Sequence, residues 1–313
     1  MRMNQYSQRA YGCAIIKAVN SNYNADFTHR PRTLPDGTAY ATDKALKYLV
    51  RNHWVQHLTG ERDYVLYWKR LNEDFNPLDL NDSYAKRFGA LEKGKGKNDK
   101  GEVLRNLLDC LDVRTFGATF ANKQAKVSLS IHGPLQISHG LNRYANSTIY
   151  AEQISSPFAD QKDGKDAAEQ TTLGTQYKID RAYYAHHLSL NPSNLTAHYQ
   201  LDGIGATGLT GQDVEKIKEG VRKGPTFYDS TAKSGTETAL LLWVTLKDKS
   251  QLVLPSFVEL VQVSDDETID LQLVTGLLAR DGIKDAIERV EVYHEPSTAV
   301  GNLPAGAEVK NLI

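Results

Sequence analysis

Apolar residues occur along this chain both in short unbroken runs and at helical spacing, so the pattern predicts strands and helices together. Tyr11 to Val19 and Ala239 to Leu246 are nearly continuous apolar runs of strand length, typical of buried strands. Helical spacing of apolar side chains predicts three helices, over residues 43–54, 103–111 and 214–221. Thr42 is a suitable cap for the first helix, and Thr210-Gly211-Gln212-Asp213 forms a capping-box sequence before the third.

The middle of the chain predicts a pair of strands. Residues 112–119 and 127–136 alternate apolar and polar positions, and Gly133-Pro134 interrupts the second segment. We expect this hairpin to be the centre of the main sheet, with Gln136 at its exit. Residues 64–68 predict one further short strand.

Two longer segments carry a different signal. Residues 20–41 form a loop rich in Asn, Asp and Pro, too long for a simple connection. Residues 148–153 and 176–190 are apolar or aromatic and enclose a polar stretch, 155–175, that we expect to project from the core. Residues 93–100 hold four lysines and two glycines and predict a basic loop.

The order strand, helix, two strands, helix, strand predicts an α+β fold of the ferredoxin-like, or RRM-like, βαββαβ type with large insertions. We expect residues 1–313 to form a single domain, with a helical insertion over about 60–110 and a hairpin over about 154–176. No internal repeat is evident.

Composition narrows the class of protein. At 40% hydrophobic and 24% charged residues, the chain is typical of a globular cytoplasmic protein, and its apolar runs are too short to predict a membrane span. The net charge of -1 conceals an asymmetry: residues 1–60 hold eight Lys/Arg against three Asp/Glu, whereas residues 259–313 hold four against eleven. A basic end favours polyanions, and opposite ends also allow head-to-tail contact between copies, although unrelated solvated faces explain the charges equally well.

The sequence offers little support for catalysis, a cofactor or a metal site. No nucleophile elbow, Walker lysine or dinucleotide-binding glycine pattern is present. The neighbouring His186 and His187 face opposite ways on a strand, so they are poor candidates for one metal site. Cys13 and Cys110 lie in apolar surroundings and predict buried reduced thiols.

Five segments in order carry a family resemblance: Asn22-Tyr23-Asn24-Ala25-Asp26 with Pro31-Arg32, Thr42-Asp43 with Leu46-Lys47 and Arg51, Asp112 to Gly117, Gly133 to Gln136, and Gly174 to Asn191. In this order they resemble the crRNA-wrapping backbone subunit of type I CRISPR interference complexes (Cascade), most closely the subtype B and C members. The resemblance implies a palm domain and a projecting thumb hairpin. It implies a protein that is not an enzyme, stacks with further copies of itself along a guide RNA, presents the guide to target-strand DNA and assembles with other Cascade subunits.

The resemblance also implies candidate RNA-binding residues. Thr42 is one candidate. Lys44, Lys47 and Arg51 follow it at helical spacing, and for these three phosphate contact is favoured over a merely solvated face. Arg30 and Arg32 fit either RNA or a neighbouring subunit, with Pro31 holding Arg30 extended. The remaining candidates are Gln136 and His139 (RNA or ordinary loop hydrogen bonds), Phe158 (a wedge against a flipped nucleotide or packing on the next subunit), Tyr177, Lys178 and Arg181 at the thumb base, and Lys233, next to an Ala232 that stands where relatives often have Arg.

Other interpretations remain for Arg114 and for the function of the protein. Arg114, between Val113 and Phe116, is better explained as a structural ion pair than as an RNA contact. Related type III subunits cut target RNA with a loop aspartate, for which Asp26 is the best candidate, but Asp and Asn also stabilise turns of this kind. A generic RRM-like RNA-binding protein is disfavoured because the predicted strands lack closely spaced aromatics.

Overall fold

The computed structural model describes residues 5–94, 96, 99–155, 173–201 and 208–313. Its main sheet has nine strands, in the order β14-β12-β9-β1-β8-β6-β2, with β5 and β7 also paired to β8. The strands of this sheet are β1 (Ala10–Ser21), β2 (Tyr40–Ala41), β5 (Leu135–Ile137), β6 (Gly140–Asn142), β7 (Ile149–Ser155), β8 (Leu173–Leu190), β9 (Thr236–Leu246), β12 (Ile287–His294) and β14 (Glu308–Lys310). The protein is therefore a mixed α+β fold.

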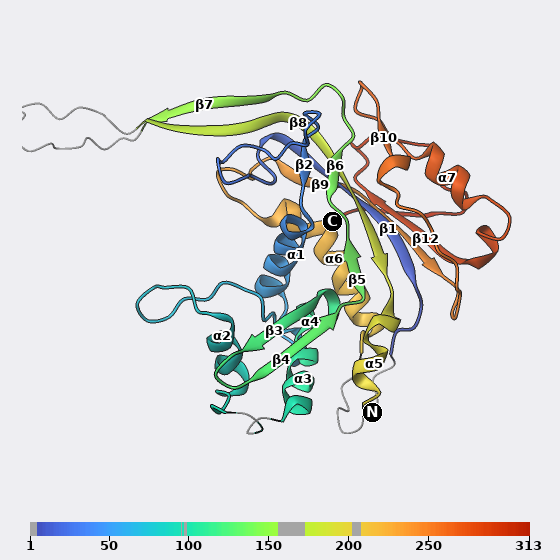
Figure 1. Ribbon diagram of the computed structural model, residues 1–313. Helices are drawn as coiled ribbons and strands as arrows, with labels where there is room; N and C mark the ends of the chain where they lie inside the picture. Colours follow the sequence, from blue (N-terminus) through green and yellow to red (C-terminus); the bar gives the residue numbers. More distant parts are fainter. Residues whose placement is uncertain (1–4, 95, 97–98, 156–172, 202–207) are drawn as a thin grey trace, which may run out of the picture.

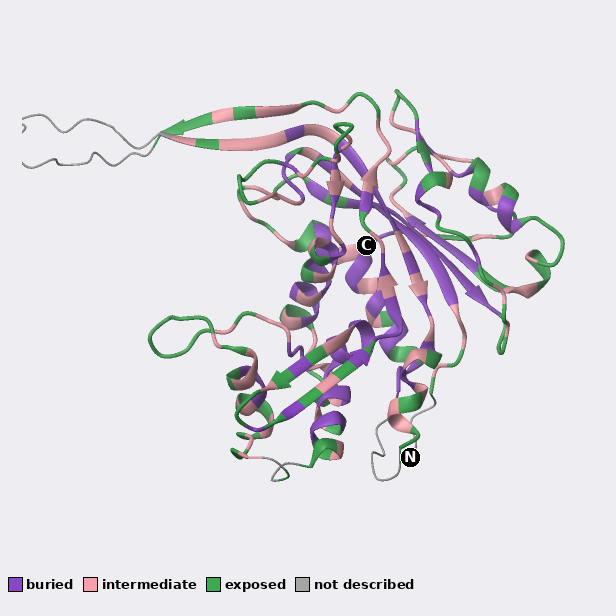
Figure 2. Ribbon diagram, in the orientation of Figure 1, coloured by how far each residue is buried: buried purple, intermediate pink, exposed green. Residues whose placement is uncertain are grey.

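Strand β1 lies at the centre of the sheet and pairs antiparallel with β8 on one side and β9 on the other. Most of its residues are buried without alternation, because both faces of the sheet are covered (Figure 2). The apolar runs at residues 11–19 and 239–246 are therefore strands, as predicted.

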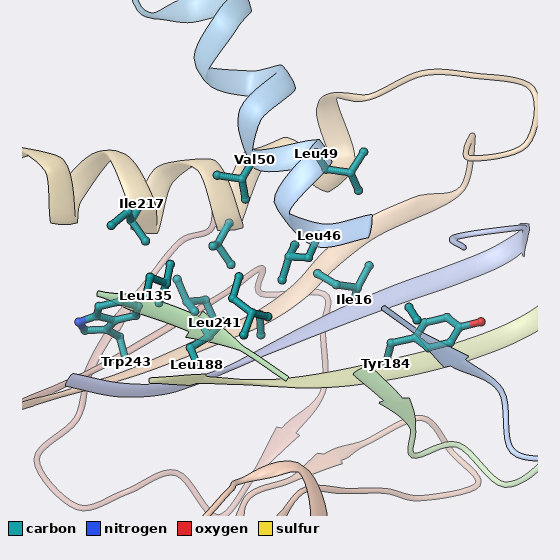
Figure 3. Close-up of a cluster of buried hydrophobic side chains, with 14 of the residues drawn as sticks. Ile16, Leu46, Leu49, Val50, Leu135, Tyr184, Leu188, Ile217, Leu241 and Trp243 are labelled. Carbon is teal, nitrogen blue, oxygen red and sulfur yellow. The ribbon is translucent and has the colours of Figure 1, made fainter. Parts of the chain in front are cut away.

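Helices α1 (Asp43–His57) and α6 (Gly211–Phe227) cover one face of the sheet. Figure 3 shows Leu46 and Val50 of α1 beside Ile217 of α6, above the sheet residues. The two helices approach closely at Gly224, where a Cβ atom would lie 2.7 Å from the Leu49 carbonyl oxygen. The predicted capping box is present at the start of α6, because the Asp213 amide donates to Thr210 Oγ1 at 3.1 Å and the Thr210 amide donates to Asp213.

The opposite face of the sheet is covered by α7 (Gln272–Leu278) and a small sheet. That sheet contains β10 (Gln262–Val263), β11 (Ile269–Asp270) and β13 (Val300–Gly301). Short 3-10 turns complete the molecule: η1 (Glu61–Asp63), η2 (Pro192–Leu195), η3 (Val258–Leu260) and η4 (Lys284–Ala286), with the one-turn helix α5 (Thr196–Tyr199) after η2.

A third hydrophobic core defines a lobe beside the sheet, at the lower left of Figure 1. The lobe contains α2 (Leu80–Phe88), α3 (Lys100–Asp109), α4 (Leu111–Phe116) and the hairpin of β3 (Gly117–Asn122) and β4 (Val127–His132). The hairpin was predicted as the centre of the main sheet, and this is wrong: β3 and β4 form a separate two-stranded sheet.

Two further predictions in this region are wrong. Residues 112–116 belong to the helix α4. All six residues of α4 are buried, so the sequence lacks the alternation of apolar and polar positions that indicates a helix. Gly117, at φ +80°, ends that helix in a conformation that favours glycine. Residues 64–68 are not a strand: the amides of Leu66 and Tyr67 donate to the Asp112 carboxylate instead of to a neighbouring strand.

Strands β7 and β8 extend beyond the sheet as a two-stranded arm. Leu173 to Ile179 of β8 pair with β7, whereas Ile179 to Leu190 pair with β1. Most of the predicted excursion, and Phe158 with it, lies outside the described residues.

Candidate nucleic-acid interface

A row of cations runs along one face of α1. Lys44, Lys47 and Arg51 follow one another at intervals of three and four residues, as predicted from the sequence. The ammonium groups of Lys44 and Lys47 each lie 2.9 Å from the Asp43 carboxylate. Burial opposes ionisation of Asp43, but these hydrogen bonds outweigh it and hold the pKa of Asp43 below its usual value. Lys44 is the member most accessible to a ligand, because its side chain is 80% exposed whereas that of Lys47 is 12% exposed.

Arg51 is held by both an anion and aromatic rings. Its Nε lies 3.1 Å from Asp112 Oδ2, and its guanidinium carbon lies 4.9 Å from the centre of the Phe116 ring. Lys47 Nζ lies 5.4 Å from the same ring. Phe116 therefore supports two cations of the row through cation–π contacts, although the sequence reasoning did not assign it to the site.

Strand β5 and the segment after it contain two further predicted residues, Gln136 and His139. His139 stacks on Tyr40 with ring centres 5.7 Å apart, and its Nδ1 lies 3.9 Å from Asp43 Oδ1. Gln136 donates to the Gly133 carbonyl oxygen at 2.8 Å, so its amide stabilises the loop. The structure thus joins His139 to the Lys44–Arg51 row, and adds Tyr40, which the sequence reasoning missed.

The loop formed by residues 22–39 is tied to both α1 and the arm. Asn24 Oδ1 accepts hydrogen bonds from the Thr42 amide at 2.9 Å and from its hydroxyl at 3.0 Å. Thr42 occupies the N-cap position of α1, as predicted, but its side chain makes no capping hydrogen bond and its hydroxyl donates to Asn24 instead. At the other side of the loop, the Arg30 guanidinium lies 4.9 Å from the centre of the Tyr177 ring, and Asn22 donates to the Tyr177 carbonyl oxygen. The loop therefore links Thr42, at the start of α1, to Tyr177 in the arm.

Three residues predicted to bind RNA, Lys178, Arg181 and Lys233, have partners within the protein. Lys178 pairs with Glu152 across the arm at 3.0 Å. Arg181 pairs with Glu267, which also accepts from Tyr183 at 2.7 Å, on the side of the sheet that α7 covers. Lys233 donates to the Tyr23 carbonyl oxygen at 2.7 Å, and burial lowers its pKa. Arg181 is therefore engaged on the side of the sheet that α7 covers, whereas Lys233 contacts the backbone of the loop formed by residues 22–39.

Arg114 is a structural ion pair, as predicted. Its guanidinium donates to both carboxylate oxygens of Asp213, at 3.1 and 2.8 Å, and both side chains are buried. Burial raises the pKa of Asp213, but the hydrogen bonds and charge of Arg114 outweigh it and the pKa is lowered overall. The pair fastens the lobe to α6.

Asp26 has the geometry of a turn residue. Its Oδ1 accepts hydrogen bonds from the Thr28 hydroxyl (2.7 Å), the Thr28 amide (2.8 Å) and the Arg30 amide (3.0 Å). The Thr28 hydrogen bond is the main cause of its lowered pKa. This is the turn chemistry that the composition of the loop predicted.

Other groups considered for chemistry have structural partners. His186 contacts Tyr23 and the Ser138 carbonyl oxygen, while His187 accepts from the Phe257 amide, and burial lowers the pKa of each histidine to about 4. Cys13 and Cys110 are buried free thiols, as predicted. Over the described ranges of the chain, no three His, Cys, Asp or Glu side chains are placed to hold a metal ion, and no helix is long and apolar enough to cross a bilayer.

The fold and this surface define an α+β protein with a cationic helix beside a projecting two-stranded arm. A family model for CRISPR-associated protein Cas7 matches residues 8–273, and the chain therefore belongs to the Cas7 family. No curated protein matches the chain.

Solved structures agree with the fold. A chain of a "CRISPR RNA-guided surveillance complex, pre-nicking" is similar over 97% of this chain and 96% of its own length, with 12% identity and a TM-score of 0.59. A chain of a "CRISPR RNA-guided surveillance complex" is similar over 96% and 94%, with 15% identity and a TM-score of 0.51.

Proposed function

We propose that this protein is a crRNA-binding backbone subunit of a type I Cascade complex, closest to the subtype B and C members. The match of residues 8–273 to the Cas7 family carries the proposal. Several copies would stack along the spacer of one guide RNA and present its bases to target-strand DNA, while other Cascade subunits complete the assembly. Such a protein binds the guide by its backbone, and base pairing supplies sequence specificity.

The α1 row supports this role physically. Lys44, Lys47 and Arg51 lie along one face of α1, and the loop of residues 22–39 continues that face towards the arm. A cationic surface of this kind suits an RNA backbone, because each phosphate contact releases counterions. We propose that the guide follows α1 and passes beneath the β7–β8 arm.

We also propose that the centre of the molecule is a ferredoxin-like palm. The strands β9, β1, β8 and β6 are adjacent in that order, with α1 between β1 and β6 in the chain and α6 between β8 and β9. This is the order expected of a βαββαβ unit in which both helices cover one face. The lobe and the arm are then insertions in that unit.

The proposal is tested by co-expressing the protein with a guide RNA and examining the purified material. We expect RNA to co-purify and the number of protein copies per RNA to increase with RNA length in sedimentation and electron microscopy. RNA-free monomers under all conditions would refute the backbone role. Saturation of RNA of every length by one copy would instead support a generic RNA-binding module.

We further propose that the subunit does not cut RNA. Asp26 Oδ1 accepts three hydrogen bonds from its own turn, which supports a structural role for this carboxylate. Complex incubated with complementary RNA and Mg²⁺ should leave the RNA intact. Cleavage that the Asp26→Ala variant abolishes would establish the nuclease alternative.

A further inference from the structure

Phe27 is nearly fully exposed at the tip of the loop formed by residues 22–39. Its side chain is 96% exposed, and among the described residues of this loop it is the sole large hydrophobic side chain with such exposure. A phenylalanine in this position makes no contribution to the core and leaves its ring almost entirely accessible to water. Single exposed hydrophobic side chains are common on protein surfaces, so a role for Phe27 has to be argued from the groups around it.

The tip that carries Phe27 is internally braced. The Asp26 amide donates to the Arg30 carbonyl oxygen at 2.8 Å, and the His29 amide donates to the Asp26 carbonyl oxygen at 3.1 Å. Together with the three hydrogen bonds to Asp26 Oδ1, these contacts close a compact turn in which His29 adopts φ +66°. The ring is therefore presented by a preformed support, which lowers the entropic cost of binding.

The charges around the ring favour an anionic ligand. The Arg32 guanidinium carbon lies 5.9 Å from the centre of the Phe27 ring, and Arg32 Nε is buried with no hydrogen-bond partner among the described residues. The carboxylate next to Phe27 in sequence, that of Asp26, is compensated by the donors of its own turn and by the charge of Arg32. An aromatic face beside a guanidinium is the combination that binds a nucleobase and its phosphate.

A second exposed phenylalanine provides a contrast within the same chain. Phe75 is 82% exposed at the tip of another braced loop, where Asn72 Oδ1 accepts from the Asp74 and Asn76 amides. Its neighbours in sequence are Glu73 and Asp74, both acidic, and Leu71 of the same loop is also exposed. The two tips have the same form, but only the Phe27 tip carries cations suited to a polyanion.

The Phe27 tip is also continuous with the proposed RNA surface. The Arg32 amide donates to the Asn24 carbonyl oxygen at 3.2 Å, and Asn24 binds Thr42 at the start of α1. We infer that Phe27 is a stacking platform for one unpaired base of the RNA whose phosphates lie along α1, with Arg32 contacting the adjacent phosphate. This inference rests on the proposed function and adds a base-contacting residue to it.

The test uses single-stranded RNA containing 2-aminopurine, titrated with the full-length protein. Wild-type protein should quench the 2-aminopurine fluorescence, because the base stacks on the ring. Phe27→Ala should weaken binding at least about fivefold at every salt concentration and abolish the quenching, whereas Phe27→Trp should retain both. Arg32→Gln should weaken binding and also reduce the slope of log affinity against log salt concentration by about 0.7. Phe27→Ala should leave that slope unchanged, because the ring carries no charge.

Phe75→Ala is the matched control, since it removes another largely exposed ring, from an acidic tip, and its RNA binding should equal that of the wild type. Neither alanine variant should change the urea midpoint, because neither ring is packed. Wild-type affinity and quenching in Phe27→Ala would overturn the inference alone, and a change confined to self-association of the RNA-free protein would show that the ring contacts a second copy instead. Absence of RNA binding by the wild-type protein would overturn the proposed function as well.

Discussion

Replacing Arg114 with methionine removes the guanidinium that pairs with Asp213 while preserving most of the buried volume. Both side chains are almost fully buried, and Arg114 also donates to the Asp109 carbonyl oxygen at 2.8 Å. The variant therefore leaves an unpaired carboxylate in the interior, which costs about 3–5 kcal/mol. Asp213 keeps its hydrogen bond from the Thr210 amide, so we expect a loss near the lower end, about 3 kcal/mol.

The free energy of unfolding is measured by urea titration with tryptophan fluorescence, which is informative because Trp54 stacks on Phe116 at the end of α4. The second substitution, Asp213→Asn, removes the stranded charge and leaves an amide oxygen to accept from Thr210. The double variant should therefore be more stable than Arg114→Met alone, giving a coupling energy well above 1 kcal/mol in a double-mutant cycle. Additive effects, or a loss below about 1 kcal/mol for the single variant, would refute this account of the pair.

The pH dependence gives a second test of the same pair. In the wild type, Arg114 holds the pKa of Asp213 low, so the contribution of the pair is present at neutral pH and is lost only as the pH falls through that low pKa. Without Arg114, burial raises the pKa of Asp213, and the unpaired charge destabilises the fold most at high pH. Arg114→Met should thus be more destabilising at pH 8 than at pH 5, with unchanged RNA affinity wherever the variant is folded.

Three further predictions concern other parts of the molecule. Lys44→Gln should reduce the salt slope of single-stranded RNA binding by about 0.7, while Lys249→Gln, at an exposed lysine in the turn after β9, leaves it unchanged; equal slopes in both variants would place the phosphates elsewhere. His186 and His187 are neutral in the fold, with pKa values of about 4, so the urea midpoint should fall as the pH is lowered from about 6.5 to about 4, and a flat profile would contradict their burial. Gly224→Ala should destabilise by about 1–3 kcal/mol by forcing α6 from the Leu49 carbonyl group, whereas Gly211→Ala, with open space at its Cβ, is the control.

The elements that the sequence predicts well have a regular pattern over many residues. The strands β1 and β9 and the helix α6 follow from long apolar runs and a capping box, both of which are local signals. Helix α4 was misread because all six of its residues are buried, so the apolar and polar periodicity that separates a helix from a strand is absent. The prediction of a strand over residues 64–68 is wrong because the Leu66 and Tyr67 amides donate to Asp112, more than forty residues away, and not to a neighbouring strand.

For the candidate site too, local patterns in the sequence predict part of the arrangement, and contacts between distant residues decide the rest. Helical spacing alone placed Lys44, Lys47 and Arg51 on one face, but it gave no sign that Arg51 is anchored by Asp112, 61 residues away. The tertiary fold decides which cations are shielded by such partners. For Phe27, the sequence shows an aromatic residue between Asp26 and the Arg30-Pro31-Arg32 segment, a pattern that fits RNA contact. The pattern alone does not distinguish an exposed ring from a buried one, and the structure shows that the ring is exposed.

The long strand β8 belongs to both the main sheet and the arm, so the sheet supports the arm at one end. Since one unbroken strand pairs with β1 in the core and with β7 outside it, the described part of the arm inherits its direction from the twist of the sheet. No loop separates the two sections of β8, so the described part of the arm has no separate hinge and changes direction only by bending of the strands themselves. The same continuity restricts how the arm can change in length: inserting two residues in each strand keeps every side chain on its face, whereas inserting one exchanges the two faces.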